Sequence, residues 1–134
     1  MTYEEKISWL SRYREAEKLY QRLSYRLAEA QEATRHITQN LSAAPGGSKD
    51  GQSLARAVER QEEAERRAYA QLAVLDALFA EIDAVLVQLD SAEYCALRKY
   101  YLDCLKWEQE AADMNFTSRG IFALRRRAIE HLKL

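Results

Sequence analysis

The sequence predicts an all-α fold in which a long antiparallel coiled-coil hairpin is followed by three shorter helices. Its 134 residues include only 4 glycines and 1 proline, a composition typical of long helices. Along two long stretches, apolar residues recur at alternating steps of four and three, which is the repeat of a coiled coil. The last third of the chain then contains capping signals and a basic segment with helical periodicity.

The first long helix is predicted from its apolar seam, because the intervening Glu, Arg, Lys and Gln residues suit a solvated face. The seam consists of Trp9, Tyr13, Ala16, Tyr20, Leu23, Leu27, Ala30, Thr34, Ile37 and Leu41. Residues 42–52, SAAPGGSKDGQ, follow it. A proline cannot continue a helix and adjacent glycines free the backbone, so we expect the chain to turn in this loop.

A second seam with the same stepping predicts the returning helix. It consists of Leu54, Val58, Gln61, Glu65, Ala68, Leu72, Leu75, Phe79, Ile82, Leu86 and Leu89. When the two helices are folded back on each other, large residues face small ones, for example Leu27 against Ala68. Such alternation allows tight layers. We therefore expect a hairpin over residues 1–90 that serves oligomerisation or partner binding.

Residues 72–89 are apolar on several faces, which indicates burial by more than one neighbour. The first helix supplies one neighbour. The sequence leaves three sources open for the other: the C-terminal helices, a second copy of the chain, or a different protein. A homodimer formed through residues 72–89 is our expectation.

Residues 91–134 are predicted to form three helices. Asp90 with Glu93 reads as a capping signal that starts a helix at 91–103, and a short helix follows at 107–114. Asn115 tolerates the left-handed backbone of a tight turn, after which Thr117 or Ser118 caps a basic helix over 117–132. A short helix, a tight turn and a basic helix favour a helix-turn-helix, so we expect a DNA-binding domain.

The last helix is expected to have two faces. Ile121, Leu124, Ala128 and Leu132 would pack inward. The residues predicted to face the DNA groove are Thr117, Ser118, Arg119, Phe122, Ala123 and Arg126, because arginine reads guanine and an aromatic ring contacts a thymine methyl group. The residues predicted to meet phosphates are Arg125, Arg127 and Lys133, together with Lys106 and Thr117 near the helix entrances.

Residues 97–132, LRKYYLDCLKWEQEAADMNFTSRGIFALRRRAIEHL, resemble region 4 of bacterial sigma-70-type factors. The turn Asn115-Phe116-Thr117 is most similar to phage-encoded late transcription activators of the ArpU/RinA type and their phage relatives. The resemblance implies a phage-encoded regulator that binds double-stranded promoter DNA in the host cytoplasm and contacts host RNA polymerase. Two residues depart from the family pattern. Glu110 stands where an aliphatic residue is usual, so we expect the helix at 107–114 to be rotated or exposed. Gly120 stands where a threonine is common.

Charge agrees with a C-terminal nucleic-acid surface. Residues 1–90 carry 12 basic and 15 acidic side chains, a net charge of −3, whereas residues 91–134 carry 8 and 6, a net charge of +2. The chain opens with TYEEK rather than an apolar leader, and two cysteines are too few for a disulfide framework, which favours the cytoplasm. No segment has the roughly 20 apolar residues that span a bilayer, so no membrane association is expected.

The sequence contains no arrangement that predicts catalysis or a cofactor. Cys95 and Cys104 are nine residues apart, which is not zinc-ligand spacing, and neither histidine has a nucleophile nearby in the sequence. We therefore expect no enzyme, no metal and no cofactor. The alternative function is a non-enzymatic coiled-coil adaptor or assembly protein, such as a DNA-packaging small subunit or an inhibitor that binds polymerase or sigma factor. The acidic first 90 residues suit this alternative.

Overall fold

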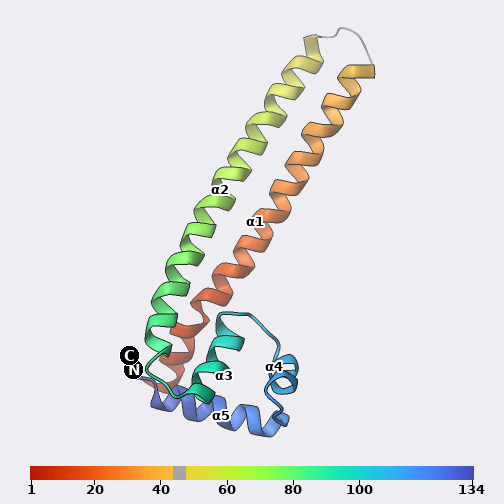
Figure 1. Cartoon of the computed structure of the whole chain (residues 1–134). Helices are drawn as coiled ribbons and strands as arrows, with labels where there is room; N and C mark the ends of the chain where they lie inside the picture. Colours follow the sequence, from red (N-terminus) through yellow and green to blue (C-terminus); the bar gives the residue numbers. More distant parts are fainter. Residues whose placement is uncertain (44–47) are drawn as a thin grey trace. The chain divides into compact units, whose positions relative to one another are not determined.

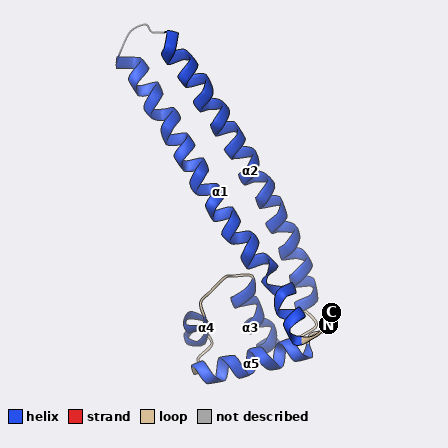
Figure 2. Cartoon of the chain, turned by 180° about the vertical axis from the view of Figure 1, so that it is seen from behind, coloured by secondary structure: helices blue, strands red, loops and turns tan. Residues whose placement is uncertain are grey.

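The computed structural model describes the backbone of residues 1–43 and 48–134, and the side chains of residues 1–40 and 51–134. These residues form five helices and no strand (Figures 1 and 2). The helices are α1 (Tyr3–Ala43), α2 (Ser48–Leu86), α3 (Ser91–Tyr101), α4 (Trp107–Asp113) and α5 (Ser118–His131). The predicted all-α class, with two long helices first, is confirmed.

The loop expected over residues 42–52 is too long. Helix α1 continues to Ala43 and α2 already begins at Ser48, while residues 44–47, which include Pro45, lie outside the described residues. Gly51 is helical, although glycine costs about 1 kcal/mol relative to alanine in a helix interior. In a helix of 39 residues the neighbouring turns outweigh this cost.

The chain divides into two compact units, which we call the central unit (residues 17–74) and the terminal unit (residues 1–16 and 75–134). In the central unit, α1 and α2 lie side by side and run in opposite directions (Figures 1 and 2). The seam predicted on α1 is half-buried there: Tyr20, Leu23, Leu27, Ala30, Thr34 and Ile37.

Two residues of the seam predicted on α2, Val58 and Leu72, are not buried. Val58 and Leu72 are 37 % and 39 % exposed, whereas Ala57 is buried. Steps of three and four both preserve a 3.5-residue repeat, so the pattern permits either neighbour. The residues that face inward are Leu54, Ala57, Gln61, Ala64 and Ala68. At this layer of the hairpin the smaller Ala57 is buried and the larger Val58 is exposed.

The core of the terminal unit joins the start of α1 and the end of α2 to the C-terminal helices. Its buried residues are Leu10, Ile82, Leu86, Leu97, Tyr101, Leu102, Ala128, Ile129 and Leu132. Phe79 packs against this core and meets Tyr13 edge-on, with ring centroids 5.9 Å apart. The C-terminal helices are therefore the second neighbour of the apolar end of α2.

Two cations of α1 bind the carbonyl-rich C-terminal ends of other helices in the terminal unit. Lys6 Nζ donates hydrogen bonds to the carbonyl oxygens of Ile129 (3.2 Å) and Glu130 (3.3 Å) in α5. Arg14 donates to the carbonyl oxygen of Tyr100, at 2.7 Å, in α3. The last carbonyls of a helix lack partners within it and carry partial negative charge. These contacts therefore give the C-terminal carbonyl groups of α3 and α5 positively charged hydrogen-bond donors.

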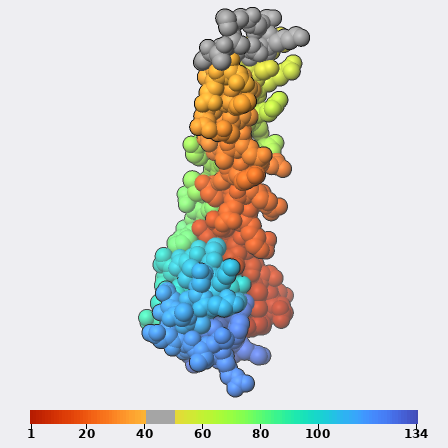
Figure 3. All heavy atoms as spheres, turned by 90° about the vertical axis from the view of Figure 1, so that its right-hand side faces the viewer, coloured from red at the N-terminus to blue at the C-terminus, as the bar shows by residue number. Residues whose placement is uncertain are grey.

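Helices α3, α4 and α5 pack on one another, and their side chains form one continuous surface (Figure 3). A second cluster holds them together: Ala96, Ala111, Ile121 and Leu124, with Trp107 and Met114 at its edge. Local signals set the helix bounds. The Asp90 side chain accepts from the Glu93 N–H at 2.8 Å, and Thr117 accepts from the Gly120 N–H at 3.1 Å. The expected caps are thus confirmed.

The turn between α4 and α5 has the predicted left-handed residue, because Asn115 has φ 58°. Cys104, in the α3–α4 connection, has φ 57° and was not predicted to be left-handed. Gly120 follows the turn, and a Cβ there would lie 3.1 Å from a ring carbon of Phe116. The missing side chain therefore lets Phe116 pack closely against the first turn of α5.

Leu86→Ala should lower the free energy of unfolding by about 2–5 kcal/mol, because it empties a fully buried position. The adjacent Val87 is 63 % exposed, so Val87→Ala should change stability by less than about 0.5 kcal/mol. Urea denaturation of both variants tests this assignment. Equal losses at the two positions would contradict it.

Candidate nucleic-acid interface

Helix α5 separates into a buried face and an exposed face, as the sequence predicts. The buried residues are Ile121, Leu124, Ala128, Ile129 and Leu132. The exposed residues include every position expected to face a DNA groove: Thr117, Ser118, Arg119, Phe122, Ala123 and Arg126. The structure therefore brings these six side chains onto one accessible surface, which we call the α5 outer face.

The two arginines of the α5 outer face differ in their surroundings. Arg119, in the first turn of α5, has no hydrogen-bond or ion-pair partner among the described residues. Arg126 lies 3.3 Å from the Glu130 carboxylate, a pair one turn apart on the same helix, and it approaches the ring of Tyr3. Exposed pairs of this kind contribute little, so both guanidinium groups are accessible to a ligand.

An aromatic stack supports the start of the α5 outer face. Tyr100 of α3 stacks on Trp107 of α4 with ring centroids 3.6 Å apart and planes 10° apart. The ring centroid of Phe122 in α5 lies 5.5 Å from that of Trp107, with the two ring planes tilted by 50°. Phe122 nevertheless remains 46 % exposed. Trp107 therefore anchors α4 to α3 and also positions the exposed Phe122.

Arg125 is directed inward rather than toward a ligand. Its guanidinium lies 4.2 Å from the centroid of Trp107 and donates a hydrogen bond of 2.8 Å to the hydroxyl of Tyr101. Cation–π contacts of partly desolvated arginines contribute roughly 0.5–2 kcal/mol each. We therefore assign Arg125 to the packing of α5 and leave it out of the proposed phosphate contacts.

Glu93 forms a charged centre that sequence reasoning treated only as part of a cap. Its carboxylate is buried and lies 3.3 Å from Arg127 Nε and 2.8 Å from His131 Nδ1. Arg127 and His131 are one helical turn apart on α5, so both reach the start of α3. The signal that could have predicted this centre is the four-residue spacing of Arg127 and His131, which places both side chains on one face of α5. One expected phosphate ligand, Arg127, is thus partly engaged by a buried carboxylate.

The two predicted phosphate-binding lysines lie near opposite ends of α5. Lys106 is exposed just before α4, which packs near the start of α5, whereas Lys133 follows the end of α5 (Figure 1). The backbone N–H of Lys133 donates to Gln88 at 3.1 Å, leaving its exposed side chain outside that contact. The two cations therefore flank the α5 outer face along its length.

The expectation that α4 would be rotated or exposed at Glu110 is wrong. Its side chain is fully buried, and neither carboxylate oxygen has a hydrogen-bond partner among the described residues. This desolvation raises the pKa of Glu110 to about 7, opposed in part by the charges of Arg125 and Lys99. The packing of Ala111 and Trp107 fixes the orientation of α4, and in this orientation the Glu110 carboxyl group is buried.

Comparison of this chain with known protein families, with curated proteins and with solved structures finds no match. Among the described helices, none is both long enough and apolar enough to cross a membrane.

Glu110→Leu should stabilise the protein at high pH. The folded-state pKa lies near 7 against an ordinary 4.5, so folding favours the protonated form and stability falls as pH rises through this range. Since one pKa unit corresponds to about 1.4 kcal/mol, the variant should gain about 3 kcal/mol at pH 8, with the gain shrinking toward pH 4.5. Urea denaturation across this range measures the effect.

The matched control is Glu108→Leu, which changes an exposed carboxylate on the same short helix. Its effect on stability should be small and should not vary across the same pH range. A pH dependence equal in both variants would show that burial of Glu110 is not its source.

Proposed function

We propose that this protein is a DNA-binding transcription regulator that reads promoter DNA with the α5 outer face. The observation that carries the proposal is the accessibility of this face, with an unpaired arginine in its first turn, on a helix whose other face is buried. In this interpretation α4, the turn at 114–117 and α5 form a helix-turn-helix, in which the second helix enters the major groove.

Each residue of the α5 outer face then has a role. Arg119 and Arg126 donate to base edges, while Phe122 and Ala123 supply apolar contacts to thymine methyl groups. Thr117 and Ser118, at the positive N-terminal end of α5, lie where a helix binds phosphate. Lys106, Lys133 and the remaining donors of Arg127 position the duplex through its backbone.

The resemblance to phage-encoded sigma region 4-like regulators extends the proposal. It implies contact with host RNA polymerase and action in the host cytoplasm. The protein would need no cofactor and would catalyse no reaction, because recognition by such a helix depends on hydrogen bonds, apolar contacts and charge alone.

A second candidate function is a coiled-coil adaptor or assembly protein, such as a DNA-packaging small subunit or a polymerase- or sigma-binding inhibitor. The exposed rings of Phe116 and Phe122 favour it, because aromatic side chains are enriched in protein interfaces. In that case the α5 outer face would bind protein rather than DNA, and duplex binding would be absent even at low salt.

Arg119→Ala should weaken binding of the duplex selected from a random-sequence pool by about 1–3 kcal/mol and relax the preference at one base position. Lys106→Ala should instead weaken all duplexes alike and lower the slope of log affinity against log salt by about 1. Fluorescence anisotropy from low to moderate salt measures both quantities.

The control for these variants is Arg35→Ala, which removes an exposed arginine of the central unit and should leave DNA affinity unchanged. Failure of the wild-type chain to bind any duplex at low salt would overturn the proposal and favour the adaptor.

We further propose a homodimer through the part of residues 72–89 that remains exposed, notably Leu72 and Val74 of α2. A two-fold dimer would read half-sites about one helical turn, or a multiple of it, apart. Leu72→Glu with Val74→Glu should then halve the mass measured by light scattering, because each copy would bring charges into an apolar contact. A single-chain mass for the wild-type protein would refute the dimer.

A further inference from the structure

An open groove runs between α1 and α2 within the central unit and contains none of the residues assigned to DNA. It encloses about 780 Å³. Apart from Leu23, the apolar side chains that line it are small: Ala30, Ala33, Ala57 and Ala64. The stretch of α1 from Leu23 to Ala33 is roughly 15 Å long at 1.5 Å per residue. The groove therefore matches about three turns of a helix laid along it.

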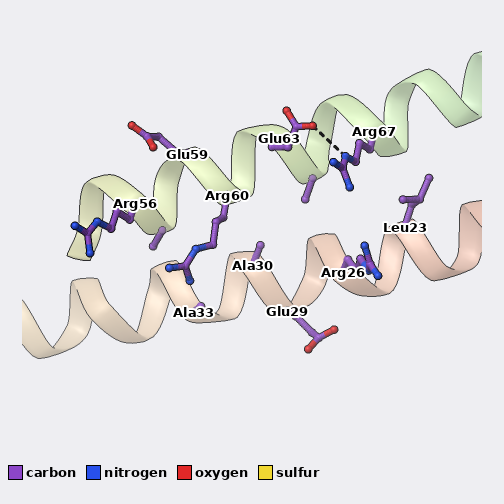
Figure 4. A pocket seen from close by; sticks show the side chains of 12 residues that line it. Leu23, Arg26, Glu29, Ala30, Ala33, Arg56, Glu59, Arg60, Glu63 and Arg67 are labelled. Carbon is purple, nitrogen blue, oxygen red and sulfur yellow. Dashed lines mark hydrogen bonds and ion pairs between the residues drawn. The ribbon is translucent and has the colours of Figure 1, made fainter. Parts of the chain in front are cut away.

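Three arginines line this groove without a hydrogen-bond or ion-pair partner among the described residues: Arg26 on α1, and Arg56 and Arg60 on α2. Figure 4 shows Arg60 reaching from α2 toward α1, whereas Arg26 lies against its own helix. Arginines of both helices therefore line the same groove. Uncompensated like charges repel one another, so the free groove favours an anionic occupant.

The carboxylates near the groove do not neutralise these arginines. Glu29 and Glu59 point away from the space between the helices (Figure 4). Glu63 is held by Arg66 and Arg67, whose hydrogen bonds keep its pKa below the ordinary value. The interior of the groove is therefore basic although its rim carries both signs of charge.

We propose that the groove binds an acidic amphipathic helix of a partner protein. Small side chains on the floor allow a third helix to approach to the usual interaxial distance of roughly 8–10 Å. Its apolar stripe would lie on the alanines, and glutamates on its two flanks would pair with Arg26 on one wall and Arg60 on the other. This is the helix-in-groove mode of recognition.

Charge and floor chemistry disfavour the other occupants. A second copy placed by a two-fold axis would set arginine against arginine. A nucleic-acid backbone would gain nothing from an alanine floor and would meet Glu29 and Glu59 at the rim. The proposal stands independently of DNA binding by α5, since none of its residues belongs to the α5 outer face.

The test uses the full chain and a fluorescein-labelled helical peptide with a leucine stripe flanked by glutamates, together with its counterpart in which lysine replaces every glutamate. Wild-type protein should bind the acidic peptide and not the basic one. Arg26→Glu with Arg60→Glu should weaken binding of the acidic peptide at least about tenfold and should create binding of the basic peptide. Circular dichroism confirms that the variant keeps its helices.

The matched control is Lys18→Glu with Arg35→Glu, which makes the same charge change at two exposed positions of α1 outside the groove lining and leaves the pairing of Glu63 with Arg66 and Arg67 intact. It should retain acidic-peptide binding. Equal loss in both double variants, or no binding of the acidic peptide to the wild-type chain, would overturn the proposal. So would a groove variant whose main defect is a changed light-scattering mass, which would indicate a second copy, or lost duplex affinity, which would indicate nucleic acid.

Discussion

Burial of Leu10, Ile82 and Leu86 beneath the C-terminal helices is the interaction on which the terminal unit depends. These three side chains come from the start of α1 and the end of α2, and they complete a core that α3 and α5 cannot close by themselves. Because Leu97 and Ile129 pack on the same side chains, the orientation of α5 follows from the packing of the long helices. The outer face of α5 is simply what this packing leaves exposed.

Two buried carboxylates show how differently the same unit treats charge. Glu93 lies within hydrogen-bond distance of Arg127 and His131, so its buried carboxylate has polar partners that join α3 to α5. Glu110 has no such partner and is held in place by the apolar packing of its neighbours. A group of this kind destabilises the fold once it ionises, so the packing of α4 should weaken as pH rises through about 7.

Local signals in the sequence predicted local structure well. Asp90 and Thr117 cap helices because their oxygens reach nearby N–H groups, and Asn115 adopts the left-handed turn. Long-range contacts were less predictable. The heptad pattern could not choose between Ala57 and Val58, since both positions fit the repeat and only the interhelical distance distinguishes them.

The contacts of the arginines at 125–127 in α5 were also not predictable from the sequence. Its periodicity predicted which face would be buried, and that prediction is confirmed at Ile121 and Leu124. It could not predict that Arg125 would stack on Trp107 or that Arg127 would reach Glu93. Those partners are distant in sequence, and the burial of Glu110 likewise depends on how α4 packs rather than on its own composition.

The contact of Lys6 with Ile129 and Glu130 has a consequence for how the chain acquires its structure. The partners are separated by 123 and 124 residues, so the start of α1 must wait for nearly the whole chain before its carbonyl partners exist. Contacts within the central unit, residues 17–74, join positions that are far closer in sequence. Folding slows as the sequence separation of contacts grows, so we infer an order of events in which the paired long helices assemble first. They then serve as the template on which α3, α4 and α5 consolidate.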